Sequence, residues 1–217
     1  MTTTQATPEV LRIVQRCEAL FEDLHFNAVK DWKAAKPGRK AIGYMPVYVP
    51  REIVHAAGML PVGILGGGDQ IEVIQGDAYY QSYICRIPRS TIELGLTGRL
   101  DCLDGMLFPS ICDVIRNLSG MWQILFPTKY VRYVDVPQNY DDAVGGKFYI
   151  EEMQHIRDDL GNLRGAPITD EELAAQPELV RTMSVQPPTG TGRVRLLDIA
   201  GVDLQPCGGT HVRNTRE

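Results

Sequence analysis

The stretch DGMLFPSICDVIRNLSGMW, residues 104–122, changes from a strand pattern to a helix pattern within a few positions. Its apolar first third predicts a short buried strand, and the spacing of apolar side chains from residue 111 onward predicts a helix. Ser110 is a natural N-cap, and Asp113 follows three residues later as in a short capping box. Cys112 is therefore expected in the first turn of a helix, at the carboxyl end of a strand.

The same alternation of strand and helix patterns extends to both sides of this stretch. Alternating strands and helices predict an α/β fold, with a mostly parallel sheet flanked by helices. In such sheets, ligands bind beyond the carboxyl ends of the strands. The expected strands are residues 40–45, 59–65, 104–109 and 129–136, and the expected helices are residues 8–35, 49–58, 88–98, 111–119 and 147–164.

Composition and charge indicate a globular protein of the cytoplasm. The 217 residues carry a net charge of −5, which does not favour general binding to nucleic acid or anionic membranes. The N-terminus is polar, unlike a secretory signal, and the longest apolar stretch is too short and too rich in glycine to span a bilayer. Free thiols or metal ligands are therefore expected rather than disulfides. The five cysteines are Cys17, Cys85, Cys102, Cys112 and Cys207.

Cys85 lies in a setting similar to that of Cys112, just before a helix that Pro88 is expected to open, and Arg86 and Arg89 flank it. Positive neighbours and helix N-termini favour a thiolate, which is the form that zinc and iron–sulfur clusters bind. Neither cysteine belongs to a CxxC pair, so a shared site would have to join distant segments. Burial of both thiols in the core is the alternative, since cysteine is among the most buried residue types.

The two remaining cysteines of the first 173 residues are expected to be structural or incidental. Cys17 lies in the middle of a predicted helix, and Cys102 follows an acidic turn.

From about residue 17 to about residue 173, the chain resembles the 2-hydroxyacyl-CoA dehydratase family, in particular the gamma subunits of ATP-dependent benzoyl-CoA reductases. The stretches that carry the resemblance are, in order, RCEALFEDLHFNAV, IGYMPVYVPREIVHAAGMLPVGILGGGDQ, DAYYQSYICRIPRSTIELGLTGRLD, DGMLFPSICDVIRNLSGMW and KYVRYVDVPQNY. The resemblance implies a four-iron four-sulfur (4Fe-4S) cluster between two α/β domains. It also implies that Cys85 and Cys112, at the YIC and SICD positions, are cluster ligands.

The resemblance also implies an activity and partners. Such complexes are oxidoreductases of anaerobic aromatic degradation: they reduce the ring of benzoyl-CoA, with ferredoxin electrons that pass through ATPase subunits. Family subunits continue through a second α/β domain, which supplies a further cluster cysteine and part of the acyl-CoA pocket. Residues 1–173 are thus expected to be half of a two-domain dehydratase-type fold that is not fully active alone, and no catalytic residue is assigned.

Residues 174–217 differ in composition and form a predicted linker with a short β-rich tail. All 9 tyrosines, 5 phenylalanines and 2 tryptophans lie at or before Tyr149. From about residue 180, and most clearly in LQPCGGTHV, the tail resembles the zinc motif of alanyl-tRNA editing domains. That resemblance implies a partial zinc site at Cys207 and His211. The HxxxH motif that completes such sites is missing, because no two of the four histidines are four residues apart.

Three functions are therefore weighed from the sequence. The first is an iron–sulfur subunit fragment of a benzoyl-CoA reductase, bound to other subunits and to an acyl-CoA. The second is a fragment of a zinc-dependent hydrolase that edits alanyl-tRNA, the one alternative that involves nucleic acid. The third is a non-catalytic assembly fragment. Two incomplete signatures in one chain favour a fused or truncated reading frame over a bifunctional enzyme.

Overall fold

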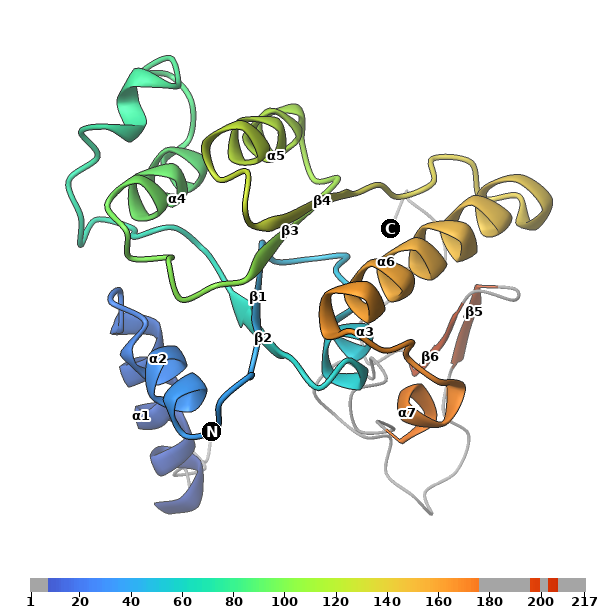
Figure 1. Ribbon diagram of the computed structural model, residues 1–217. Coiled ribbons are helices and arrows are strands. Elements are labelled where there is room, and N and C mark those ends of the chain that lie inside the picture. The colour runs from blue at the N-terminus through green and yellow to red at the C-terminus, as the bar shows by residue number, and fades with distance from the viewer. Residues whose placement is uncertain (1–7, 176–195, 200–202, 207–217) are drawn as a thin grey trace, which may run out of the picture. The chain divides into compact units, whose positions relative to one another are not determined.

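The computed structural model describes residues 8–175, 196–199 and 203–206 (Figure 1). The chain divides into two compact units. Among the described residues, the first unit comprises those within Met1–Val49 and Gly58–Val134, and the second comprises those within Pro50–Ala57 and Asp135–Glu217. Within this part of the chain, none of the helices combines the length and the apolar character needed to span a bilayer.

The first unit is built on a four-stranded sheet in the order β2-β1-β3-β4, and every neighbouring pair of strands is parallel. This confirms the predicted α/β class. The direction of the strand order reverses between β1 and β3, which makes their carboxyl ends the topological switch point where such sheets bind ligands. The strands are β1 (Ala41–Tyr44), β2 (Leu60–Gly63), β3 (Gly105–Pro109) and β4 (Tyr130–Val134).

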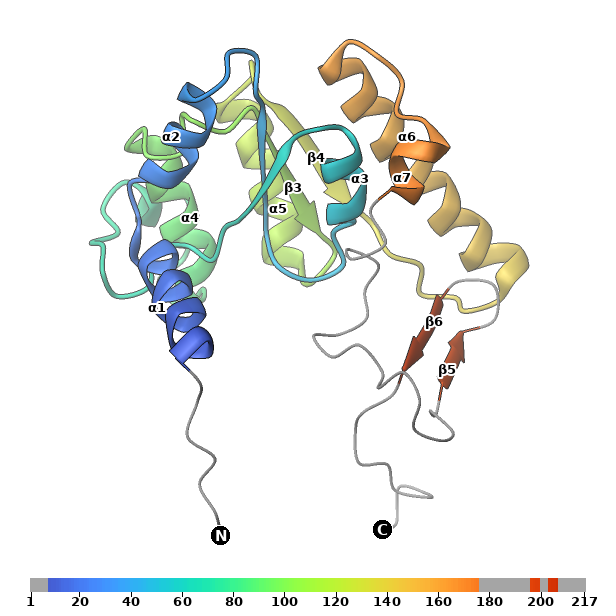
Figure 2. The ribbon, with the colours of Figure 1, turned by 90° about the horizontal axis from the view of Figure 1, so that it is seen from below.

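The helices of the first unit bury the central strand β3, all five residues of which are buried. Helix α5 packs on β3 and β4, and it lies beside α4 in both Figure 1 and Figure 2. Phe108 of β3 meets Trp122 of α5 with ring centroids 5.8 Å apart. The helices are α1 (Pro8–Glu22), α2 (Asn27–Ala34), α4 (Arg86–Leu96) and α5 (Asp113–Leu125), with a 3₁₀ turn η1 (Gly76–Ala78) before α4.

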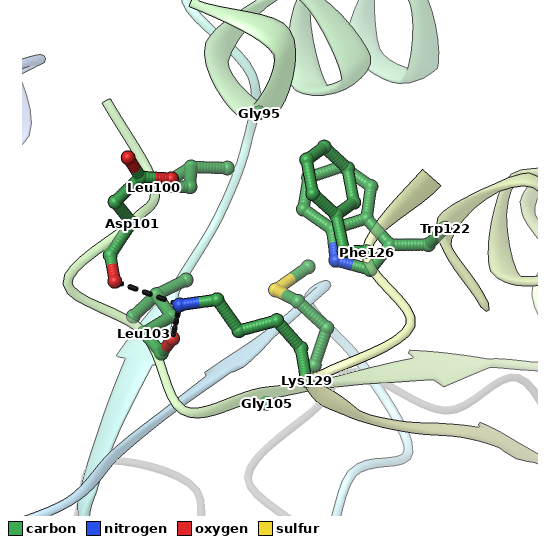
Figure 3. A pocket seen from close by; sticks show the side chains of 9 residues that line it. Gly95, Leu100, Asp101, Leu103, Gly105, Trp122, Phe126 and Lys129 are labelled. Carbon is green, nitrogen blue, oxygen red and sulfur yellow. Dashed lines mark hydrogen bonds between the residues drawn. The ribbon is translucent and has the colours of Figure 1, made fainter. Parts of the chain in front are cut away.

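A small void lies beneath α5, beside the aromatic rings of Trp122 and Phe126 (Figure 3). The Lys129 ammonium group donates hydrogen bonds to the carbonyl oxygens of Asp101 and Leu103, at 2.7 and 2.5 Å, and so closes one side of it. The void measures about 10 Å³, which is about the space that one water molecule needs. It is therefore a packing defect and not a ligand site.

The second unit contains α3 (Arg51–Ala56), α6 (Lys147–Arg164) and α7 (Asp170–Ala174), with a π turn η2 (Asp142–Gly146) before α6. Helix α6 has the bounds that its apolar spacing predicts. Two short antiparallel strands, β5 (Leu196–Ile199) and β6 (Asp203–Pro206), follow within the tail that was expected to be β-rich.

The single helix predicted for residues 8–35 is wrong, because the chain forms two helices there. Asp23 follows the first, and its carboxylate accepts the backbone amide of Ala28 at 2.9 Å, which belongs to the first turn of the second. Phe26 between them adopts a left-handed conformation with φ of 54°. A side chain that binds a nearby amide competes with helix continuation, which explains the break.

Helix α1 has no buried residue. Its apolar stripe, which includes Leu11, Val14 and Phe21, is exposed. Cys17 on the same helix is likewise exposed, whereas Val29 of α2 is buried and joins the core.

Helix α7 is attached to α6 by an ion pair that depends on pH. The Arg164 guanidinium donates to both carboxylate oxygens of Glu172, at 2.8 and 3.0 Å, and lowers the pKa of that carboxyl from 4.5 to about 2. The amide of Thr169 donates a further bond to the same carboxylate within a capping box. Because the pKa is lower in the folded chain, the contact stabilises α7 fully above pH 4.5 and is lost as the pH falls towards 2.

We therefore expect Glu172→Gln to lower the free energy of unfolding at pH 6, and to have a much smaller effect near pH 2. Chemical denaturation of both proteins at each pH measures this, because acid effects common to both proteins cancel in the difference. A difference between the two proteins that does not change with pH would contradict the role of this ion pair.

Candidate metal centre at the carboxyl edge of the sheet

Cys112 lies just beyond β3, at the carboxyl edge of the sheet. It is the N-cap of α5, with φ of −161° and ψ of 165°, and its carbonyl oxygen accepts the amides of Ile115 and Arg116 at 3.1 and 3.3 Å. The predicted N-cap at Ser110 is wrong. The Ser110 amide donates instead to the carbonyl of Val134 at 2.9 Å, which extends the pairing with β4 and delays the start of the helix.

Cys85 ends the long connection from β2 to α4 and is the N-cap of α4. The helix begins at Arg86, so Pro88 is its third residue and not its first as predicted. Proline is tolerated there because the first amides of a helix have no acceptor within the helix.

Both thiols therefore occupy the same kind of position, at the N-termini of two neighbouring helices. Both are free and exposed, so burial in the core is wrong for Cys85 and Cys112. Neither side chain forms a capping hydrogen bond, which leaves the sulfurs available. The positive end of a helix dipole favours a thiolate, and thiolates are the ligands of zinc and iron–sulfur clusters.

Tyr80 connects the two thiols electrostatically. Burial raises the pKa of its hydroxyl, and the charges of Cys112 and then Cys85 raise it further. Both sulfurs therefore lie within electrostatic reach of one hydroxyl group. Tyr80 was not predicted from the sequence. The one signal that could have indicated it was its position in YYQSYIC, five residues before Cys85.

The arginines expected to favour a thiolate on α4 also hold the preceding connection in place. The Arg86 guanidinium donates to the carbonyl oxygens of Gly68, at 2.6 Å, and Ile71. Arg89 forms an ion pair with Asp77 at 2.6 Å. These bonds tie residues 68, 71 and 77 of the β2–α4 connection to the first two turns of α4.

Glu93 holds the same connection from the next turn of the helix. It is 5% exposed, and its carboxylate accepts the backbone amides of Ile74 and Gly76 at 3.0 and 2.7 Å. Residues 86, 89 and 93 lie on one face of α4, because side chains three or four residues apart are neighbours on a helix. The connection that carries Tyr80 and Cys85 is therefore bound to α4 by polar side chains along one face of that helix.

We expect Glu93→Ala to lower the free energy of unfolding by roughly 3 kcal/mol, because the buried amide of Gly76 and the part-buried amide of Ile74 lose a carboxylate acceptor. Glu93→Gln, which keeps one oxygen acceptor without the charge, should cost roughly 1 kcal/mol. Urea denaturation measures both values. An Ala variant as stable as the wild type would show that Glu93 does not anchor the connection.

The loop after β1 reaches the same edge, since Tyr44 pairs with Leu107 of β3. Its residues Val47 and Tyr48 have φ of 77° and 60°, and both side chains are exposed. A left-handed conformation is rare for a β-branched residue and indicates local strain. The switch point of the sheet thus presents exposed apolar side chains on the loop next to that of Cys112.

A larger hollow of about 280 Å³ lies within the second unit. Apolar side chains dominate its wall, including Ile53, Tyr149 and Met153. Arg157 also lines it, but this guanidinium is engaged with Asp170 at 2.6 Å. No thiol lines the hollow, so it offers no metal ligand of the predicted kind.

The other candidate metal ligands do not add to the edge site. Cys102 is half-buried against the core, where its packing was expected. Cys207 and His211 lie outside the described residues, so the partial zinc site stays a prediction. Within the described residues, no group of three or more His, Cys, Asp or Glu side chains could hold a metal ion. Cys85 and Cys112 are therefore two thiols that need further ligands.

Two family models match consecutive parts of the chain. Residues 46–184 match the family described as 2-hydroxyglutaryl-CoA dehydratase, D-component. Residues 194–217 match the threonyl and alanyl tRNA synthetase second additional domain, as the motif in the tail suggested.

Comparison with curated proteins agrees with the first match. The chain is 69% identical over 163 residues to a subunit of the benzoyl-CoA reductase of Thauera aromatica, which covers 75% of this chain and 42% of the relative. It is 35% identical over 137 residues to (R)-2-hydroxyglutaryl-CoA dehydratase subunit beta of Acidaminococcus fermentans, and this match covers 63% of this chain and 36% of the relative. It is 30% identical over 165 residues to lactoyl-CoA dehydratase subunit beta of Anaerotignum propionicum, and this match covers 74% of this chain and 43% of the relative.

The chain spans less than half the length of these relatives. The matches confirm the resemblance read from the YIC and SICD stretches, and the relatives are subunits of reductase and dehydratase enzymes. The chain belongs to the 2-hydroxyglutaryl-CoA dehydratase D-component family.

Proposed function

We propose that this chain is part of a benzoyl-CoA reductase-type subunit and supplies Cys85 and Cys112 as thiolate ligands to a 4Fe-4S cluster. The observation that carries the proposal is the pair of exposed thiols at the N-termini of two neighbouring helices, beside the switch point of a parallel sheet. Membership of a family of acyl-CoA dehydratase and reductase subunits supports it.

The residues present fit such a cluster chemically. The two sulfurs are soft ligands whose side chains do not cap their helices, and the buried hydroxyl of Tyr80, whose pKa their charges raise, is a donor without a partner among the described residues. Iron–sulfur clusters are usually held by four thiolates, so two ligands would come from other segments or chains. When bound, such a cluster supplies electrons one at a time at low potential.

The substrate and partners are proposed from the relatives. A reductase subunit is more similar to this chain than the dehydratase subunits are, which favours reduction over dehydration. In the proposed reaction the aromatic ring of benzoyl-CoA takes up two electrons and two protons, and the thioester stabilises the ring radical formed by the first electron. The electrons would come from ferredoxin through ATPase subunits that join this chain in a complex.

Anaerobic purification followed by iron, sulfide and zinc analysis tests this proposal. Iron and sulfide close to four atoms each, per chain or per dimer, are expected for one cluster. Zinc without iron would favour the editing hydrolase suggested by the tail, and a chain without metal would favour a non-catalytic assembly fragment. Either of these results would overturn the iron–sulfur assignment.

Residues 174–217 are proposed to be a linker followed by a separate tail segment, whose resemblance begins near residue 180. The first family match ends at residue 184 and the second begins at residue 194, so the two do not overlap, and only the second includes Cys207 and His211. Two unrelated families in succession support a fused reading frame. Sequencing transcripts from the source across codons 170–195 tests this, and an uninterrupted transcript from an intact gene would contradict it.

A further inference from the structure

The Tyr80 hydroxyl is buried and has no hydrogen-bond partner among the described residues. The Tyr80 side chain packs against the hydrophobic core of the first unit. Buried hydroxyl groups in folded proteins nearly always have a partner, and an exception calls for a missing ion, ligand or water. This hydroxyl therefore identifies a place where an acceptor is expected.

The backbone on both sides of Tyr80 is hydrogen-bonded to side chains of α4. Before it, Glu93 binds the amides of Ile74 and Gly76. After it, the Arg89 guanidinium donates to the carbonyl oxygen of Ile84 at 3.3 Å. The segment that carries Tyr80 is thus held by α4, the helix whose N-cap is Cys85.

The acceptor is inferred from the position of Tyr80, which lies on the connection that ends at Cys85, the N-cap of α4. Burial raises the pKa of Tyr80 first, and the charges of Cys112 and Cys85 raise it further, so both sulfurs lie within electrostatic reach of the hydroxyl. A tyrosine hydroxyl is protonated at neutral pH and can donate a hydrogen bond. Sulfur atoms bound to metal are negatively charged acceptors, and hydrogen bonds to them help to set cluster potentials.

We propose that Tyr80 is a positioning residue whose hydroxyl donates a hydrogen bond to a sulfur of the cluster held by Cys85 and Cys112, and so raises its reduction potential. The inference rests on the proposed function, because it requires the cluster. The physical reason for the direction is that the reduced cluster carries more negative charge, so a donor to sulfur stabilises it more than the oxidised form.

Tyr80→Phe, which removes the hydroxyl and keeps the ring, tests this inference. The full chain is reconstituted anaerobically with ferric iron, sulfide and an excess of 2-mercaptoethanol, which reduces part of the iron and supplies small thiolates for the remaining iron sites. The midpoint potential is then measured by titration followed by electron paramagnetic resonance. We expect a more negative midpoint for Tyr80→Phe, by about 59 mV for a tenfold change in a one-electron equilibrium.

Tyr83→Phe is the matched control, because Tyr83 lies in the same connection but is 80% exposed. Its midpoint potential should equal that of the wild type. A shift of the same size in both variants would show that the effect is not specific to Tyr80 and would overturn the inference.

Two further results separate failure of the inference from failure of the proposed function. If the wild type binds no iron and sulfide, the cluster assignment is wrong and the inference falls with it. If a cluster forms but Tyr80→Phe has the wild-type potential, the inference alone is wrong. The metal-free variant should unfold at no lower urea concentration than the metal-free wild type; a lower midpoint would reveal a partner within the protein and also overturn the inference.

Discussion

Replacing Cys112 with serine is expected to reduce reconstituted iron at least about tenfold, because even residues that only support metal ligands contribute roughly 10- to 100-fold to affinity. The same loss is expected for Cys85→Ser. A serine hydroxyl does not ionise near neutral pH, so it cannot replace a thiolate on iron. Each variant leaves this chain with one of its two proposed sulfur ligands. Iron and sulfide analysis after anaerobic reconstitution measures the loss.

The chain provides its own control for this experiment. Cys17 is an exposed thiol like the proposed ligands, but it lies in the middle of α1 and not at a helix N-terminus. Cys17→Ser should retain all of the iron. Because the three thiols are exposed, each substitution should change the free energy of unfolding by less than about 0.5 kcal/mol in the metal-free chain. Equal loss of iron from Cys17→Ser would contradict the assignment.

Phe108→Ala is expected to lower the free energy of unfolding by about 3–5 kcal/mol, the usual cost of truncating a fully buried phenylalanine. Phe108 has no solvent exposure and lies in the most buried strand of the sheet. Its ring contacts Trp122, which in turn packs against Phe126 with centroids 4.5 Å apart. The cavity would open between β3 and α5, the two elements that present Cys112.

Urea denaturation measures this change. The dependence of the free energy of unfolding on urea concentration should stay the same, which would show that the compactness of the folded and unfolded states is unaltered. Ile124→Ala on α5 is the matched control, because Ile124 is 80% exposed and its truncation should cost less than about 0.5 kcal/mol. If the two substitutions have equal effects, the packing of α5 on β3 does not contribute this stability.

The order of strands and helices was readable from the sequence because it depends on local patterns. The buried run of β3 and the apolar spacing of α6 each reveal an element without knowledge of its partners. The boundaries at Ser110 and Asp23 were not readable in this way. Ser110 pairs with Val134 and Asp23 binds the amide of Ala28, and each of these contacts overrides a sequence pattern.

The candidate site likewise contains residues that the sequence predicted and one that only the structure identified. The sequence alone indicated Cys85 and Cys112, because a thiol between a strand end and a helix start has a recognisable setting and the YIC and SICD stretches resemble a family. Tyr80 could not be identified from the sequence, because the residues next to it do not show whether its hydroxyl has a hydrogen-bond partner. The hydroxyl becomes buried only when the β2–α4 connection folds and Glu93 binds it, and the charges of both thiols then raise the pKa of Tyr80.

The amino-acid sequence by itself therefore determined the α/β class, the family and the two thiols, because periodicity and consecutive motifs are properties of the chain. The tertiary structure decided that both thiols are exposed N-caps of two neighbouring helices, and that the hydroxyl of Tyr80 is buried with no partner among the described residues. The physical reason is that exposure and hydrogen bonding depend on contacts between residues distant in the chain, which form only when the strands pair and the helices pack on them.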